Sequence, residues 1–334
     1  MNRDVIVIGA GASGMMTAIM ASRYGDRVIL LEKLSSIGAK LKATGGGKCN
    51  LTNTLPKEIF MKHFGRNGRF MTDALDAFNN ESLKEFFLSI GVKIYAPDGF
   101  RVFPIGHSSK TIINAFQKEM NRVGVEIYYN QSVKNIEFDK NIKIVQTDKA
   151  EFRAEKIVVA TGGLGYPVLG AEGDGFRLAE DMGHRVTSLY PAMMPLHTKE
   201  IWVARCVADT IPKVKIRVNL KKYKKLSAQG DLIFTKNGIR GPVVLDFSRE
   251  ISPILDKFGE VPLLMNLTKG LNGEEIREKF KFTLLNKPEI LVIDLVQTIL
   301  PYSLSLALCN EVDCWGARAL NVVKHFVPFL MNHV

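Results

Sequence analysis

The residues best suited to chemistry lie in a glycine-rich turn near the start of the chain. Gly9-Ala10-Gly11-Ala12-Ser13-Gly14 has the spacing G-x-G-x-x-G, and it follows a short apolar run. Gly9 permits a tight turn, Gly11 lets the backbone approach a pyrophosphate, and Gly14 lets a helix pack closely on a strand. The free N–H groups of a helix that begins at this turn favour phosphate binding. The pattern therefore predicts a dinucleotide site.

Glu32 narrows the choice of dinucleotide. It ends the next apolar run, 18 residues past Gly14, where a carboxylate accepts hydrogen bonds from the 2′-OH of a ribose. The same carboxylate would repel a 2′-phosphate, so the expected ligand is FAD or NAD rather than NADP. A glycine-rich turn of an unrelated α/β fold is the alternative, and the strand, helix and acidic residue around the turn disfavour it.

A second glycine-rich segment, residues 39–53, carries cations on both sides of Gly45-Gly46-Gly47. Consecutive glycines expose backbone amides, and such a loop suits an extended, phosphate-bearing cofactor. A basic surface loop has the same composition, so the residues alone leave both interpretations open.

The elements that position these loops follow from hydrophobic periodicity. Residues 5–8 and 28–31 are continuous apolar runs of strand length, and a helix is predicted between them from about residue 12 to 24. This is a βαβ unit of a parallel sheet covered on both faces. Further helices are expected around residues 75–90 and 112–123, and further strands at 125–129, 133–138, 142–147 and 157–160.

The pattern of apolar and charged residues changes after residue 190. Val214, Ile216, Val218 and Leu220 alternate with cations, which is typical of a half-exposed antiparallel strand. From about residue 271 the pattern is helical. We therefore predict an α/β fold with a Rossmann-like FAD-binding domain (1–190), a β-rich insert on the substrate side (191–262) and a helical region (263–334).

These motifs together resemble the BaiN/YhiN-type flavoprotein family of NAD(P)/FAD-dependent, aminoacetone oxidase-like oxidoreductases. The resemblance runs from residue 1 to about 310 and rests most on residues 40–53, with Ala160-Thr161-Gly162-Gly163, Tyr166-Pro167 and Gly173-Asp174-Gly175 in support. It implies a Rossmann-like FAD domain interrupted by a β-barrel-like insert and a small helical domain. It also implies that Val133 reaches the adenine through its backbone. The expected FAD-binding residues are Gly9, Gly11, Ser13, Gly14, Glu32, Lys33, Ala39, Lys40, Thr44, Gly46, Asn50, Val133, Thr161 and Gly162.

The sequence departs from this family near its end. The family closes with an acidic, Gly-rich FAD segment, and no such segment follows Leu308. By the resemblance, the adenosine half of the site is complete and the flavin half is incomplete, which predicts weak FAD binding. An inactive, truncated nucleotide-binding fragment is therefore one alternative to an active enzyme.

The expected function is an FAD-dependent oxidoreductase that acts on a small organic substrate, with NAD(P)H as a candidate reductant. No catalytic residue, metal site or oligomeric state is specified by the sequence. The net charge of +11 favours anionic partners, and a basic flavoprotein that binds RNA is a second alternative. We favour a solvated hairpin tip for Lys221-Lys222-Tyr223-Lys224-Lys225 and no nucleic acid. Asp294, Gln297 and Pro301 interrupt the longest apolar stretch, so a cytoplasmic protein without a membrane span is expected.

Overall fold

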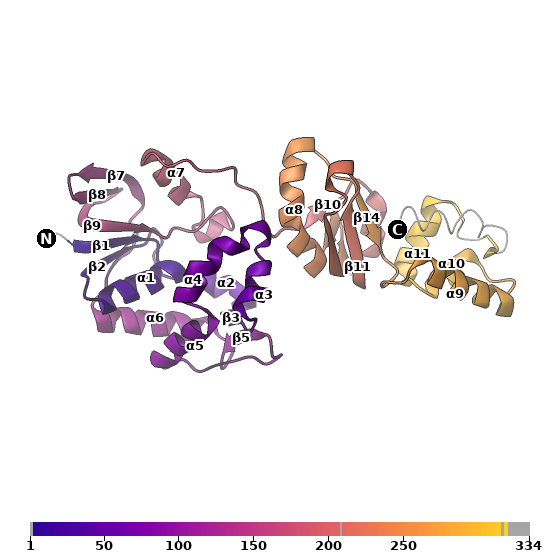
Figure 1. Ribbon diagram of the computed structural model, residues 1–334, viewed down its shortest axis with the longest axis horizontal. Coiled ribbons are helices and arrows are strands. Elements are labelled where there is room, and N and C mark those ends of the chain that lie inside the picture. Colours follow the sequence, from indigo (N-terminus) through magenta and orange to yellow (C-terminus); the bar gives the residue numbers. More distant parts are fainter. Residues whose placement is uncertain (1–2, 208, 315–316, 320–334) are drawn as a thin grey trace. The chain divides into compact units, whose positions relative to one another are not determined.

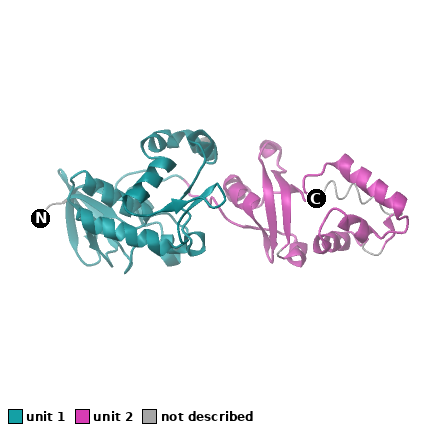
Figure 2. Cartoon of the chain, turned by 90° about the horizontal axis from the view of Figure 1, so that it is seen from below, with its two compact units in different colours: residues 1–187 teal, residues 188–334 magenta. Residues whose placement is uncertain are grey.

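The computed structural model describes residues 3–207, 209–314 and 317–319. The chain forms two compact units, residues 1–187 and 188–334, shown in teal and magenta in Figure 2. The predicted Rossmann-like α/β fold is confirmed in the first unit.

A six-stranded sheet organises the first unit, in the order β6-β2-β1-β9-β8-β7 (Figure 1). The strands β6, β2, β1 and β9 run parallel, and β8 and β7 extend the sheet in antiparallel fashion. Their bounds are β1 Arg3–Ile8, β2 Val28–Leu31, β6 Glu126–Tyr128, β7 Val133–Asp139, β8 Ile142–Thr147 and β9 Glu151–Val159.

Both faces of this sheet are covered, as the continuous apolar strands require. Val5 and Val7 of β1 pack with α1 (Ala12–Arg23) and α6 (Ser109–Val123) on one face. Ile6 and Ile8 face the opposite cluster, which includes Leu178 of α7 (Asp174–Asp181). The carboxyl ends of β1, β2 and β9 therefore carry the predicted loops along one edge of a packed sheet.

Other elements of the first unit are short. The expected single helix over residues 75–90 is wrong, because the chain forms α4 (Thr72–Ala77) and α5 (Asn80–Ser89) instead. The side chain of Asn79 accepts hydrogen bonds from the backbone N–H groups of Glu81 and Ser82, so it caps α5 and separates the two helices. The remaining elements are α2 Ala39–Ala43, α3 Lys57–Lys62, and a small antiparallel sheet of β3 Thr52–Asn53, β5 Arg101–Pro104 and β4 Ile94–Tyr95.

The second unit contains a five-stranded antiparallel sheet in the order β10-β13-β12-β11-β14. The residues of β11 that alternate with cations, Val214, Ile216 and Val218, are buried as predicted. The strand bounds are β10 Leu196–His197, β11 Thr210–Val218, β12 Ser227–Thr235, β13 Gly238–Arg240 and β14 Leu263–Asn266, so β14 extends the sheet past residue 262.

Four helices complete the described part of the second unit. The sequence analysis did not predict α8 (Pro242–Phe258), which packs on β12 and contributes Val243, Phe247 and Ile251 to the core. The others are α9 Gly273–Asn286, α10 Val292–Gln297 and α11 Tyr302–Glu311. The chain beyond residue 319, which bears on the expected helical region and the closing segment, lies outside the described residues.

Candidate functional site

The three glycines of the turn between β1 and α1 each have a different geometric role. Gly9 has φ +101°, a backbone conformation that disfavours any side chain. A Cβ placed on Gly14 would lie 1.8 Å from the backbone oxygen of Gly9, so the helix and the strand end are in direct backbone contact. A Cβ on Gly11 would meet no protein atom within 4 Å, because this residue faces open space. The protein's own geometry therefore favours glycine at Gly9 and Gly14, whereas no protein atom requires glycine at Gly11.

Glu32 directly follows β2 and is buried, with 8% of its surface exposed. Its carboxylate accepts a hydrogen bond from the backbone N–H of Ala10 (2.8 Å) and another from that of Leu34 (2.8 Å). The Ala10 bond ties Glu32 to the glycine turn. Each carboxylate oxygen keeps a second acceptor position, so the fixed side chain can still accept hydrogen bonds from a ligand.

A cavity of about 380 Å³ opens over the turn and over the carboxyl ends of β1, β2 and β9. Most of the predicted cofactor residues line it: Gly9, Gly11, Ser13, Glu32, Lys33, Ala39, Lys40, Thr44, Val133, Thr161 and Gly162. We call it the nucleotide cleft. Its position at the strand ends is where parallel α/β sheets bind ligands.

Three predicted residues do not line the nucleotide cleft. Gly14 lies behind the turn and is buried. Gly46 is exposed, with φ +65° in the turn over Thr44–Gly47. Asn50 lines a second cavity instead. The glycine-rich segment thus shapes the edge of the cleft, while its last residues belong to the neighbouring cavity.

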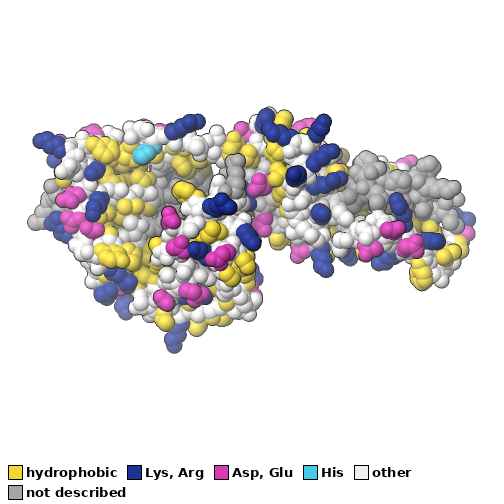
Figure 3. All heavy atoms as spheres, viewed as in Figure 1, with side chains coloured by type: hydrophobic (Ala, Val, Ile, Leu, Met, Phe, Trp, Pro, Cys, Tyr) yellow, Lys and Arg dark blue, Asp and Glu magenta, His cyan; other side chains and the backbone are white. Residues whose placement is uncertain are grey.

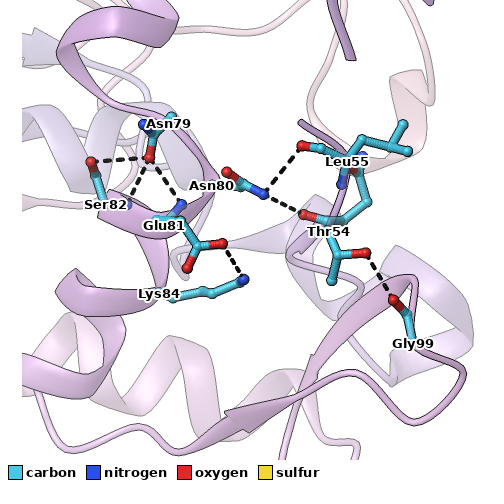
Figure 4. Close-up of polar contacts among 9 residues, drawn as sticks. Thr54, Leu55, Asn79, Asn80, Glu81, Ser82, Lys84 and Gly99 are labelled. Atoms are coloured by element: carbon cyan, nitrogen blue, oxygen red, sulfur yellow. Dashed lines mark hydrogen bonds and ion pairs between the residues drawn. The ribbon is translucent and has the colours of Figure 1, made fainter. Parts of the chain in front are cut away.

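The second cavity has a volume of about 430 Å³ and shares Ala12, Ser13, Leu41 and Thr44 with the nucleotide cleft. We call it the apolar cavity, because Met16, Leu51, Leu55, Phe60, Leu75, Phe78, Leu83, Phe87, Ile112 and Phe116 line it. In Figure 4, the amide of Asn80 donates to the backbone oxygens of Asn53 (3.0 Å) and Leu55 (3.4 Å). The start of α5 therefore holds the segment after β3 in place as one wall of this cavity.

Two lysines of the cleft have different environments. Lys33 donates hydrogen bonds to Glu172 (2.7 Å) and Asp174 (2.8 Å). Burial lowers the pKa of Lys33, but the bonds to Asp174 and Glu172 more than offset this, so the pKa lies above its ordinary value. Lys40 directs its Nζ toward Gly162, where an added Cβ would lie 3.5 Å from it. Lys33 is thus held by carboxylates at one side of the cleft, and Lys40 extends across it.

Two residues of α7 that shape the cleft were not predicted from the sequence: Asp174, which lines it, and Arg177, which holds the start of β7. Arg177 of α7 donates to the backbone oxygens of Val133 (3.2 Å) and Lys134 (2.8 Å), and so fixes the start of β7. Asp174 starts the same helix and holds Lys33. The signal was present, because Gly173-Asp174-Gly175 was used for the resemblance without a role for its carboxylate.

Nothing in the described residues adds a metal or a reactive thiol to this region. Among them, no cluster of three or more His, Cys, Asp or Glu could hold a metal ion. Burial raises the pKa of the Cys49 thiol, which opposes a reactive thiolate. Within the described ranges, the helices are too short or too polar to span a bilayer.

Comparison with known proteins identifies the family of the chain. The family model of the HI0933-like protein Rossmann domain matches residues 3–286. A 3-dehydro-bile acid delta(4,6)-reductase of Clostridium scindens is 29% identical over 84% of this chain and 68% of its own length. A ribosomal RNA dihydrouridine synthase of Haemophilus influenzae is 27% identical over 78% of this chain and 64% of its own length.

The chain thus spans about two thirds of the length of these curated relatives. Among solved structures, the open conformation of a flavocytochrome c3 fumarate reductase aligns with 63% of this chain and 47% of its own at a TM-score of 0.41 and 18% identity. Because the family model covers most of the sequence, the chain belongs to the HI0933-like family of FAD-dependent oxidoreductases with a Rossmann-like domain.

Proposed function

We propose that this chain is a reductase that uses FAD to saturate a carbon–carbon double bond conjugated to a carbonyl group. The observation that carries the proposal is the nucleotide cleft, in which the glycine turn and the buried Glu32 open toward the apolar cavity through shared residues. A dinucleotide site next to an apolar space suits a cofactor that meets an organic substrate.

The residues of the cleft fit FAD. The open space at Gly11 admits a pyrophosphate at the N-terminus of α1, where four backbone N–H groups lack helical partners. Glu32 would accept from the adenosine ribose, while Val133 would lie near the adenine. Lys33 and Lys40, with Ala39 and Thr44, would follow the phosphates and the ribityl chain, and Thr161 and Gly162 would complete the rim.

The reaction class is that of the two relatives described above. The Δ4 and Δ6 double bonds of a 3-dehydro bile acid are conjugated to its carbonyl group, and the double bond that is lost when uridine becomes dihydrouridine is also conjugated to a carbonyl group. Both reactions add a hydride and a proton across the bond, with NADH or NADPH as the proposed source of the two electrons. Bound FAD supplies the hydride transfer in such reactions.

The chain's own residues would position the substrate and exclude water. Apolar side chains of α1, α5 and α6 line the apolar cavity, so the unsaturated carbons would lie in a dry environment. Negative charge grows on the carbonyl oxygen as the hydride arrives, and a polar group must stabilise it. Asn50 and Thr52 place polar side chains in this wall, and we propose Asn50 as the hydrogen-bond donor.

The test starts with the visible absorption spectrum and flavin content of the purified chain. We expect FAD to bind with the weak affinity that an incomplete flavin half predicts, to be bleached by NADH or NADPH under anaerobic conditions, and to recover its colour when a conjugated enone is added. A chain that takes up no FAD in a fluorescence titration would overturn the cofactor assignment. A chain that binds FAD but is never reoxidised by a steroid enone or by a uridine-containing oligonucleotide would overturn the reaction class alone.

A further inference from the structure

Positive charge is concentrated in one segment of the second unit. Residues 210–240 contain nine Lys or Arg and one acidic residue, Asp231, so this segment carries +8 of the chain's formal net charge of +11. The rest of the chain is close to neutral in comparison. A charge that is collected on a tenth of the sequence creates a local field rather than a general one.

The fold gathers these cations on the outer face of the five-stranded sheet. Along β11, Lys213, Lys215 and Arg217 are exposed, and the residues between them point into the core. Lys215 and Arg217 are alternate residues of the strand, so they lie about 6.6–6.8 Å apart on one face. Lys213 precedes them at the irregularity between Ile211 and Val214, with φ +56°, and is also exposed. The exposed cations continue at the turn between β11 and β12, where Lys221, Lys222, Lys224 and Lys225 are exposed.

We call these seven residues the basic sheet face. Figure 3 shows Lys and Arg side chains gathered over the part of the chain that holds this sheet. Most of their neighbours across the strands are polar, since Lys215 pairs with Gln229 of β12 and Asn266 of β14, and Arg217 pairs with Ser227 of β12 and with Leu264 of β14. The face is therefore cationic, with hydrogen-bonding side chains beside the cations.

Within the described part of the chain, no carboxylate neutralises the basic sheet face. The ion pairs of the second unit join Lys199 to Glu260, Arg249 to Glu250 and Arg318 to Glu289, and none involves residues 210–240. Asp231 accepts a hydrogen bond from the backbone N–H of Lys213 at 3.2 Å, not from a cation. Like charges at this density repel one another, so a polyanion would gain the full attraction without breaking existing pairs.

The surroundings indicate which polyanion fits. A membrane-binding surface combines cations with exposed large apolar side chains, and no such side chain between residues 210 and 240 is exposed. A five-stranded sheet is too broad to enter the groove of a duplex, which admits a helix or a two-stranded ribbon. Single-stranded RNA is held by cations that contact its phosphates and by aromatic rings on which its bases stack. Tyr223, in the middle of the lysine run, is partly exposed and contacts the exposed ring of Phe258 at a centroid distance of 6.3 Å, so this face offers both features.

We propose that the basic sheet face binds single-stranded RNA through its phosphate backbone. The turn position that the sequence predicted for the lysine run is confirmed, and the unpaired cations on β11 extend it into a surface. This proposal does not depend on the FAD site, which lies in the first unit.

The test uses fluorescence anisotropy with a labelled 20-nucleotide RNA and the full chain. A variant with Lys221, Lys222, Lys224 and Lys225 changed to Gln removes four charges from the face. The matched control changes four exposed lysines elsewhere in the same unit, Lys269, Lys279, Lys281 and Lys287, to Gln. We expect the first variant to lose about tenfold or more in affinity and the slope of log K against log salt to fall by up to about 3, because each phosphate contact contributes about 0.7.

The control variant should retain wild-type affinity, and both variants should keep the wild-type unfolding temperature. Equal losses in the two variants would show that only total charge matters and would overturn the proposal. A DNA strand of the same sequence that binds more tightly than the RNA, or vesicles of anionic phospholipid that bind while the RNA does not, would overturn the assignment to RNA.

Discussion

Lysines and arginines occur both in the first unit and on the basic sheet face, but the two groups differ in whether a carboxylate pairs with them. In the first unit, Arg27 is paired with Asp4, and both Arg23 and Arg122 are paired with Glu119. On the basic sheet face, the described residues provide no such partner. Paired cations hold elements together, whereas unpaired cations remain available to an outside anion. Charge alone therefore does not indicate a binding site, whereas several unpaired cations that share one face do.

The two proposed sites differ in the same way. The nucleotide cleft is built from backbone geometry and one buried carboxylate, so its recognition is short-range and a single atom can abolish it. The basic sheet face acts through many exposed charges, each of which contributes little and is screened by salt. A single substitution should therefore abolish cofactor binding in the cleft, whereas each substitution on the basic sheet face should weaken RNA binding only slightly.

The largest effect is expected for Gly14→Ala. The new Cβ would lie 1.8 Å from the Gly9 backbone oxygen, so α1 must move away from β1. We expect a loss of about 3 kcal/mol or more in the free energy of unfolding, measured in urea. Gly11→Ala is the matched control and should leave stability nearly unchanged. Without the clash, alanine would stabilise the helix by about 1 kcal/mol, so a stabilised Gly14→Ala variant would contradict this account.

Gly11→Val separates ligand contact from folding. The side chain would enter the open space of the nucleotide cleft without meeting protein atoms. We expect the apo protein to unfold at the wild-type temperature while FAD affinity falls about 100-fold, roughly 2.7 kcal/mol. Flavin content and a fluorescence titration measure the loss. A variant that purifies with a full complement of flavin would show that the pyrophosphate does not lie over Gly11.

The sequence predicted those parts of the fold that depend on local chemistry. The glycine turn, β1, α1, β2 and Glu32 follow from glycine conformation and apolar spacing within about 30 residues. The break at Asn79 was missed because the apolar spacing continues across it, although an asparagine before an acidic helix turn is a capping signal. The ends of α8 were also encoded, with Pro242 at its start and Gly259 in the left-handed conformation after it.

The candidate site was less accessible to sequence reasoning. The nucleotide cleft is formed by segments more than 100 residues apart, such as the glycine turn and Thr161, which only the sheet order brings together. The apolar cavity has no motif, since its wall consists of ordinary core-type side chains from several helices. The basic sheet face was visible as a lysine run, but its extension along β11 depends on strand pairing.

Glu32→Gln tests whether the cleft depends on a charge. The structure favours Gln over Ala here, because the two carboxylate oxygens accept separately from Ala10 and Leu34. Gln keeps one acceptor oxygen for one of these N–H groups and places its NH2 against the other, whereas Ala would leave both N–H groups buried without a partner. We expect Gln to weaken FAD binding by about 1.5 kcal/mol, the lower range for a hydrogen bond to a charged group. Calorimetric titration measures this value. Unchanged affinity would remove Glu32 from the proposed ribose site.

The smallest effect is expected for Glu119, whose carboxylate pairs with two arginines of the first unit. The side chain of Glu119 is 6% exposed and accepts from Arg122 at 2.7 Å and from Arg23 of α1 at 2.5 Å. The hydrogen bond from Arg122 lowers the pKa of Glu119 most, burial opposes it, and Arg23 lowers it further, to about 2 from 4.5. We expect Glu119→Gln to cost about 1 kcal/mol at pH 7, less than the pKa shift alone implies, because solvent screens Arg122.

The pH dependence of this loss of stability tests whether the paired arginines of the first unit act electrostatically, in contrast to the unpaired cations of the basic sheet face. The folded pKa of Glu119 lies below the unfolded one, so the stabilisation is complete above pH 4.5 and is lost as the pH falls toward 2. Unfolding of wild type and Glu119→Gln should therefore differ at pH 7, differ less at pH 3, and converge only as the pH falls to about 2. RNA binding by the basic sheet face should not respond to this substitution at pH 7, because Glu119 neutralises arginines of the first unit only. A constant stability difference from pH 7 to pH 3 would show that Glu119 acts through packing, and the contrast between paired and unpaired cations would lose its electrostatic basis.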